Sequence, residues 1–340
     1  MRLDYLFIEK EGTYIFEDVV LNRFIRWFIK IVISFSLIFY LLQKIGFEKL
    51  TNIFYGLDIS WFIVALILVT VSNILGVLQW HFLLQSGNIN ISYKRTLLYY
   101  YNGLFFNNFL LSLFGGDIFR VYDISKHSGK YSSAISSVFL DRVIGLMAMA
   151  TLSVFFGIIA TYIFHKGYFL LLTGGFFVFF LLILAFFYFK NFAKKFQAVT
   201  EKILPAVVFQ KLREVYNSIY YFKNHRRMIF FLFLNSIIIQ TLRIGAHYVA
   251  ALSLNVNSVS IWYFYIFVPI IFVISMLPIT IGGLGVRESI GIVLFGYVGI
   301  SGDMAFSIEF LAYIIGILSS LPGGIAFVIT KHEKINEIQN

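Results

Sequence analysis

The chain has 340 residues, of which 59% are hydrophobic, 19% aromatic and 13% charged. Soluble domains carry about a quarter charged residues, so this composition excludes a soluble enzyme, a secreted disulfide scaffold and a disordered tail. Lys and Arg outnumber Asp and Glu by 27 to 17, and most basic residues fall between apolar runs. In that setting anionic lipid headgroups are the expected partners, and nucleic acid is not.

A helix needs roughly 20 mostly apolar residues to cross a bilayer. Seven segments fit: Trp27–Gln43, Ser60–Gln85, Ser133–Phe164, Tyr168–Phe189, Ile229–Leu252, Ile261–Thr280 and Ala305–Thr330. Two further apolar segments, Leu97–Phe114 and Gly283–Gly299, contain several Asn or Gly residues. Such segments suit re-entrant or broken helices, whose open backbone must face protein or water. The sequence therefore predicts an all-α polytopic membrane protein with about seven or eight transmembrane helices and two re-entrant or broken helices.

Charge asymmetry between the connecting segments predicts the orientation. Nine basic residues lie from Lys190 to Arg227, whereas residues 255–260 contain none. We expect the loop 190–227, the tail 331–340 and the N-terminal segment 1–26 to be cytoplasmic. Residues 27–330 then form a single membrane domain. Apolar residues recur at near-helical spacing in this loop. It is either an amphipathic helix on the inner leaflet or a charged linker that only sets orientation.

Two distant stretches of the chain match each other. Gly115–Arg120 and Gly282–Arg287 share the form Gly-Gly-x-x-x-Arg, and Ala134–Gly145 aligns with Ala305–Gly316. The offset between the pairs changes only from 167 to 171 residues. The conserved order predicts an internal repeat. In transporters, related halves with broken helices often meet at a central site, although a duplicated protein that moves nothing would show the same pattern.

The repeated motif combines residue types that suit an anion. Glycine lets the backbone approach a ligand closely, a helix start presents free N–H groups, and Arg offers a planar fork for phosphate. The candidate phosphate-binding residues are Gly115, Gly116, Arg120, Gly282, Gly283 and Arg287. Alternatively, the glycines form tight turns and the arginines reach lipid phosphate without selectivity.

Further charged residues lie at or inside the apolar segments. Asp117 can orient Arg120 through an i,i+3 pair, and we expect Glu288 to orient Arg287 although it follows it directly. A charge deep in a membrane must be paired or hydrated. We therefore expect four residues to face an internal polar cavity: Asp141, Arg142, Arg243 and His247. A purely structural ion pair, such as Asp141 with Arg243, is the alternative.

Familiar catalytic patterns are missing from the sequence. It has no Gly-x-x-x-x-Gly-Lys-Ser/Thr loop, no His-Glu-x-x-His and no Gly-x-Ser-x-Gly, and it contains no Cys and only six scattered His. We expect no metal and no cofactor, no direct nucleotide hydrolysis, and a protein that is not an enzyme.

Three runs carry a resemblance to a known family: Gly115-Gly116-Asp117-x-x-Arg120, Phe139-Leu140-Asp141-Arg142-x-x-Gly145 and Leu277-Pro278-x-x-x-Gly282-Gly283-x-Gly285-x-Arg287-Glu288. The chain resembles the transmembrane region of lysylphosphatidylglycerol synthases, the flippase-like integral membrane family, from about Trp27 to Thr330. It departs from the family in lacking a Pro shortly before the first Gly-Gly. The resemblance implies a multispanning module that translocates lipids, sometimes fused to an aminoacyl-transferase domain. The sequence contains no such domain, so we do not expect lipid aminoacylation.

Together these observations predict translocation of an anionic phospholipid or a polyprenyl-phosphate lipid between the leaflets of the cell membrane. One alternative is a membrane enzyme acting on a lipid-linked sugar or headgroup, with Asp117 or Asp141 as its base. Another is a scaffold for a separate cytoplasmic transferase. The oligomeric state stays open.

Overall fold

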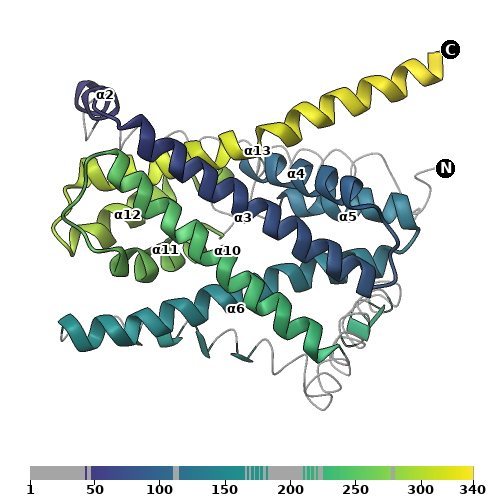
Figure 1. The fold of residues 1–340 in the computed structure, drawn as a ribbon, viewed down its shortest axis with the longest axis horizontal. Helices are drawn as coiled ribbons and strands as arrows, with labels where there is room; N and C mark the ends of the chain where they lie inside the picture. The colour runs from purple at the N-terminus through teal and green to yellow at the C-terminus, as the bar shows by residue number, and fades with distance from the viewer. Residues whose placement is uncertain are drawn as a thin grey trace, which may run out of the picture.

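The computed structural model describes residue 43, residues 47–109, 115–164, 225–276 and 280–339, and isolated positions between 167 and 220. Within these residues the chain is helical and contains no strand, and Figure 1 shows long helices packed side by side across the molecule. The helices are α2 (Phe47–Tyr55), α3 (Ile59–Ser86), α4 (Tyr93–Phe109), α5 (Gly115–Ser128), α6 (Tyr131–Phe164), α10 (Arg226–Ser253), α11 (Ile261–Ser275), α12 (Val286–Gly296) and α13 (Gly302–Gln339), with a 3₁₀ turn at Ile281–Gly283.

Four of the described helices are long and apolar enough to cross a membrane. They are α3, residues Tyr131–Ile159 of α6, α10, and residues Gly302–Ile329 of α13. The predicted all-α, polytopic architecture is therefore confirmed. The expected spans Trp27–Gln43 and Tyr168–Phe189 lie almost entirely outside the described residues, as do the segment 1–26 and most of the loop 190–227.

The expected span Ile261–Thr280 is shorter than predicted, because α11 ends at Ser275. Its 15 residues measure about 22 Å at 1.5 Å per residue, less than the roughly 30 Å hydrocarbon core. The chain then passes through Gly282, Gly283 and Gly285, which have φ values of 58°, 75° and 81°, before α12 begins. Backbone in this left-handed region favours glycine. The segments α11 and α12 therefore form one broken helical element.

The helices occur in two series with the same order. Helix α3 spans Ile59–Ser86 and α10 spans Arg226–Ser253, so both have 28 residues and their ends are offset by 167. In each series a long helix is followed by two short helices and a second long helix, α6 or α13. The packing follows the same equivalence, because α4 packs on α13 as α11 packs on α6. The fold thus contains the internal repeat that the sequence predicts.

The two repeats run in opposite directions. Helices α3 and α10 lie side by side along their length (Figure 1). The Asp58 N–H at the start of α3 donates to the Ser253 carbonyl at the end of α10, at 2.8 Å. At the other end, the Ser86 hydroxyl lies 2.7 Å from the Met228 sulfur. Because equivalent helices are antiparallel, the repeats are inverted, as in many secondary transporters.

Candidate functional site

A cavity of about 260 Å³ lies where the two repeats meet. Its walls come from α3, α4, α5 and α6 of the first repeat. From the second repeat they come from α10, α11, α12, α13 and the turn Ile281–Gly283. Seven of the predicted site residues line it: Arg120, Asp141, Arg142, Arg243, His247, Gly282 and Arg287. The repeated motifs, which are 167 residues apart in sequence, therefore both contribute an arginine to one cavity.

The first repeat contributes a compact cluster of two arginines and two aspartates. Arg120 donates to Asp141 at 2.8 Å and to Asp117 at 3.2 Å. Arg142 forms a two-point contact with Asp117, at 2.7 and 3.0 Å. Arg120, Asp117 and Asp141 are all buried. Two arginines thus face two aspartates within hydrogen-bond distance, and the formal charges of the cluster balance.

Arg120 is also enclosed by aromatic rings. Its guanidinium carbon lies 4.1 Å from the Trp80 ring centroid and 4.6 Å from that of Tyr100. Gly103 provides the space, because a Cβ there would lie 2.7 Å from the Arg120 side chain. Two carboxylates and two rings therefore surround the guanidinium of Arg120, and of its nitrogens only the buried Nε lacks an acceptor among the described residues.

The second repeat contributes a looser cluster. Arg287 lies 3.7 Å from a carboxylate oxygen of Glu288 and 3.7 Å from one of Glu309, beyond hydrogen-bond distance in both cases. Its guanidinium carbon is 5.1 Å from the Tyr313 ring centroid, and the Tyr313 hydroxyl donates to the Asn108 carbonyl at 3.1 Å. Arg287 therefore occupies the place equivalent to Arg120 without comparable anchoring.

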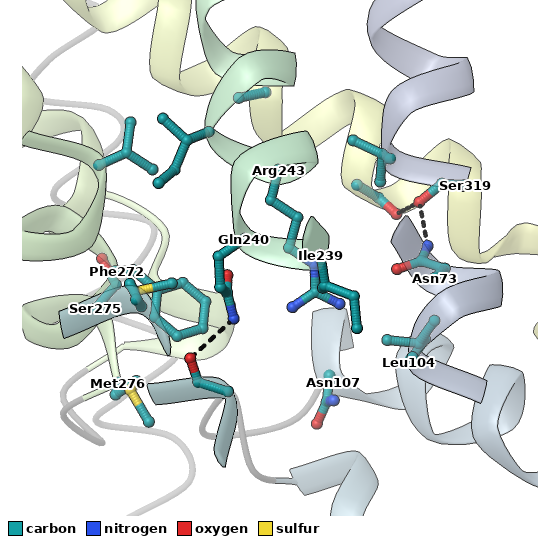
Figure 2. Close-up of a pocket in the computed structure, with 18 of the residues that line it drawn as sticks. Asn73, Leu104, Asn107, Ile239, Gln240, Arg243, Phe272, Ser275, Met276 and Ser319 are labelled. Atoms are coloured by element: carbon teal, nitrogen blue, oxygen red, sulfur yellow. Dashed lines mark hydrogen bonds between the residues drawn. The ribbon is translucent and has the colours of Figure 1, made fainter. Parts of the chain in front are cut away.

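Arg243 extends from α10 into the cavity, between Gln240 and Asn73 in the view of Figure 2. Its Nε–H donates a long, 3.4 Å hydrogen bond to the Ser72 hydroxyl. Among the described residues, no carboxylate lies within ion-pair distance of it. The expected alternative pairing of Asp141 with Arg243 does not form, since Asp141 binds Arg120. One turn further along α10, His247 donates from Nδ1 to the Arg243 carbonyl at 3.0 Å.

Amide side chains, which the sequence reasoning missed, hold the repeats together around the cavity. Gln79 donates to Asp141 at 3.0 Å and accepts from Ser236 of α10 at 2.7 Å. Gln240 donates to the Gly145 carbonyl at 3.1 Å, and its repeat equivalent Asn73 donates to the Ser319 hydroxyl at 3.3 Å (Figure 2). Buried amides inside apolar segments were the available signal, because such groups are costly without partners.

The two Gly-Gly pairs differ in conformation. Gly115 and Gly116 are helical residues at the start of α5, and the Gly116 N–H donates to Asn107 at 2.7 Å. At the start of α12 the Gly285 N–H donates to Glu288 at 2.6 Å. The chain's own side chains thus already bind main-chain amides at both helix starts. Five predicted site residues lie behind the cavity wall: Gly115, Gly116, Asp117, Gly283 and Glu288. Of the family motif, Leu277 and Pro278 lie outside the described residues.

Comparisons with known proteins agree with this fold. The family model described as "Lysylphosphatidylglycerol synthase TM region" matches residues 27–323. A UPF0104 membrane protein of Pyrococcus horikoshii is 24% identical over 332 residues, covering 91% of this chain and 98% of that protein. A UPF0104 membrane protein of Methanocaldococcus jannaschii is 26% identical over 333 residues, covering 90% and 95% respectively.

Proposed function

The chain belongs to the lysylphosphatidylglycerol synthase TM region family, and from this membership and the cavity we propose that it translocates an anionic lipid between membrane leaflets. The single observation that supports this most directly is Arg243. It is a cation inside a helix long and apolar enough to span a membrane, and it faces a cavity. Among the described residues, its side chain has one hydrogen-bond partner, the Ser72 hydroxyl. A charge at that position is costly unless a counter-ion or water accompanies it, so an anionic headgroup is the fitting ligand.

Arg287 is the second group that we assign to the anion. It lines the same cavity, and its carboxylate contacts are 3.7 Å long, so a phosphate could replace them with charge-assisted hydrogen bonds. The sequence had suggested Arg120 as the partner of Arg287. The geometry instead favours Arg243, because Arg120 is committed to Asp117 and Asp141.

Phosphate is common to both expected substrate classes, a membrane phospholipid and a polyprenyl-phosphate lipid. The proposal includes residence in the cell membrane with the C-terminus in the cytoplasm. The inverted repeats add support, because a central site shared by two oppositely oriented halves can open to either side. The alternative of an enzyme with Asp117 or Asp141 as its base gains no support, since both carboxylates accept hydrogen bonds from arginine.

Reconstituted vesicles test the proposal. Fluorescent phosphatidylglycerol is placed in both leaflets, and a reductant quenches the outer one, so exchange appears as additional loss of signal. We expect Arg243→Gln to slow exchange by about tenfold or more, since a hydrogen bond to a charged group contributes about 1.5–3 kcal/mol.

Arg227→Gln is the matched control, because it makes the same change at an exposed position of the same helix. It should leave exchange unchanged. A parallel experiment with a fluorescent polyprenyl phosphate distinguishes the two lipid classes. Equal exchange by the wild type and Arg243→Gln with both lipids would contradict the assignment.

A further inference from the structure

The two repeats differ in how they balance charge. In the first, two arginines face two aspartates within hydrogen-bond distance. In the second, a single cation, Arg287, lies 3.7 Å from each of two carboxylates, Glu288 and Glu309. Among the described residues around the cavity, the balance of four positive and four negative charges is complete only when Arg243 is counted. In formal charge, Arg243 offsets the one excess negative charge of the second cluster, although it forms an ion pair with neither glutamate.

Glu309 is the carboxylate least satisfied by this arrangement. It is completely buried, it lines the cavity, and neither of its oxygens accepts a hydrogen bond from any residue that the structure describes. Gly291 of α12 leaves room for it, because a Cβ there would lie 2.6 Å from the Glu309 side chain. Glu288 differs, since it accepts the Gly285 N–H at the start of α12, where a helix favours a negative charge.

The surroundings of Glu309 contain few other ionisable groups. Helix α12 presents Arg287 and Glu288, and α10 presents Arg243 and His247. The cavity-lining residues of α3, α4 and α11 contribute no charged side chain, and α2 contacts α13 through Phe54 on Phe310. On α13 itself, Tyr313 lies against Arg287. An anion bound at Arg287 and Arg243 would neutralise Arg287, the cation that lies 3.7 Å from Glu309, and also Arg243, which offsets the remaining negative charge in the formal count.

We propose that Glu309 is a proton site coupled to the anion site, so that the cavity binds one anionic headgroup together with one proton. This rests on the proposed function and adds its coupling ion. The proton is taken up from the aqueous solution and binds a carboxylate oxygen of Glu309 when the headgroup binds Arg243 and Arg287. It is released to the solution when the headgroup dissociates. The bound cavity is then neutral in total, which is the state that a membrane interior tolerates best.

Proton uptake on lipid binding is the first test. Purified full-length protein in weakly buffered detergent is mixed with dioctanoyl phosphatidylglycerol, and a pH-sensitive dye records the protons taken up. Binding is followed separately by the thermal shift of the protein. We expect about one proton per bound lipid in the wild type and in Glu48→Gln, which changes an exposed glutamate. We expect none in Glu309→Gln.

Infrared difference spectra identify the group. Adding the lipid should produce the band of a protonated carboxyl, which is absent in Glu309→Gln and shifted in Glu309→Asp. The Asp variant keeps the test valid if the Gln variant does not fold. Lipid binding without proton uptake, or binding that responds to sodium at constant pH, would overturn the proton site and leave the proposed function standing. Failure of the wild type to bind the lipid would overturn both.

Discussion

Arg120 and Arg243 both line the cavity, but their surroundings indicate different roles, structural for Arg120 and ligand binding for Arg243. Arg120 is 3% exposed, hydrogen-bonded to two aspartates and enclosed by Trp80 and Tyr100. Arg243 is half-buried and has the Ser72 hydroxyl as its hydrogen-bond acceptor. Removing a buried cation that is hydrogen-bonded to carboxylates leaves those carboxylates unpaired and destabilises the fold, whereas a cation facing a cavity with few partners is available to a ligand.

This contrast predicts that Arg120 matters most for stability. Arg120→Gln leaves Asp141 buried with Gln79 as its remaining side-chain donor among the described residues, and we expect a loss of about 3–5 kcal/mol in the free energy of unfolding. Arg287→Gln should cost clearly less, because its ion pairs are 3.7 Å long. Denaturant unfolding in detergent measures both values.

A double variant supplies the control. Asp141→Asn combined with Arg120→Gln removes both partners, so its loss should be smaller than the sum of the single losses. Strictly additive losses would show that the 2.8 Å contact contributes nothing to stability.

At the residue scale, the sequence located the charged groups but could not assign their partners. A charge inside an apolar segment is visible from hydropathy, and Arg243 was expected in the cavity for that reason. Which acid binds Arg120 depends on how α5 meets α6, and that is set by tertiary packing. The amides Asn73, Gln79 and Gln240 were missed because uncharged polar residues disturb hydropathy less than charges do.

At the scale of elements, the same Gly-Gly-x-x-x-Arg pattern has two structural causes. Gly282 and Gly283 adopt φ values of 58° and 75° in a break before α12. Gly116 is helical and lies against the Gly103 carbonyl, where α4 and α5 touch. The first pair therefore permits close helix packing, and the second permits a turn.

Substitution with alanine separates these causes. A Cβ on Gly116 would overlap the Gly103 backbone, so Gly116→Ala must force α4 and α5 apart. We expect a loss of about 1–3 kcal/mol in the free energy of unfolding. Lipid exchange should also slow, because α5 forms part of the cavity wall. Gly245→Ala on α10 is the control, since a Cβ there meets no atom within 4 Å. Equal stability of the two variants would contradict the packing role.

The four long apolar helices, α3, α6, α10 and α13, could be predicted from apolar length, because a membrane span requires about 20 such residues. Helices α3 and α10 begin and end within three residues of the predicted segments. The end of α11 was predicted five residues too late, because Leu277–Ile281 continues the apolar run past Ser275. Hydropathy reports burial, and it carries no information on a backbone that turns while remaining buried.

At the scale of the whole molecule, the inverted repeats and the central cavity are linked. Equivalent helices α3 and α10 are antiparallel neighbours, and their equivalent amides Asn73 and Gln240 both line the cavity. The cavity therefore lies on the approximate two-fold axis that relates the halves. A ligand in the cavity would contact both repeats, which have opposite orientations in the membrane. This is the geometry expected for a site that opens alternately to the two sides.

The antiparallel arrangement of α3 and α10 also fixes which connecting segments share a side of the membrane. Asn90 follows the end of α3 and Arg227 lies in the first turn of α10, so they should face one side of the membrane. Ser258 follows the end of α10 and should face the other side. All three side chains are exposed, and the native chain contains no Cys. Asn90→Cys, Arg227→Cys and Ser258→Cys, made singly, can therefore be labelled in sealed vesicles with an impermeant maleimide. Asn90→Cys and Arg227→Cys should react from the same side, and Ser258→Cys only from the opposite side. The basic residues between Lys190 and Arg227 predict that the first side is the cytoplasm.

Labelling of Asn90→Cys and Ser258→Cys from one side would mean that α3 and α10 do not cross the membrane in opposite directions. The inverted repeat would then be wrong, and access from both sides would lose its structural support.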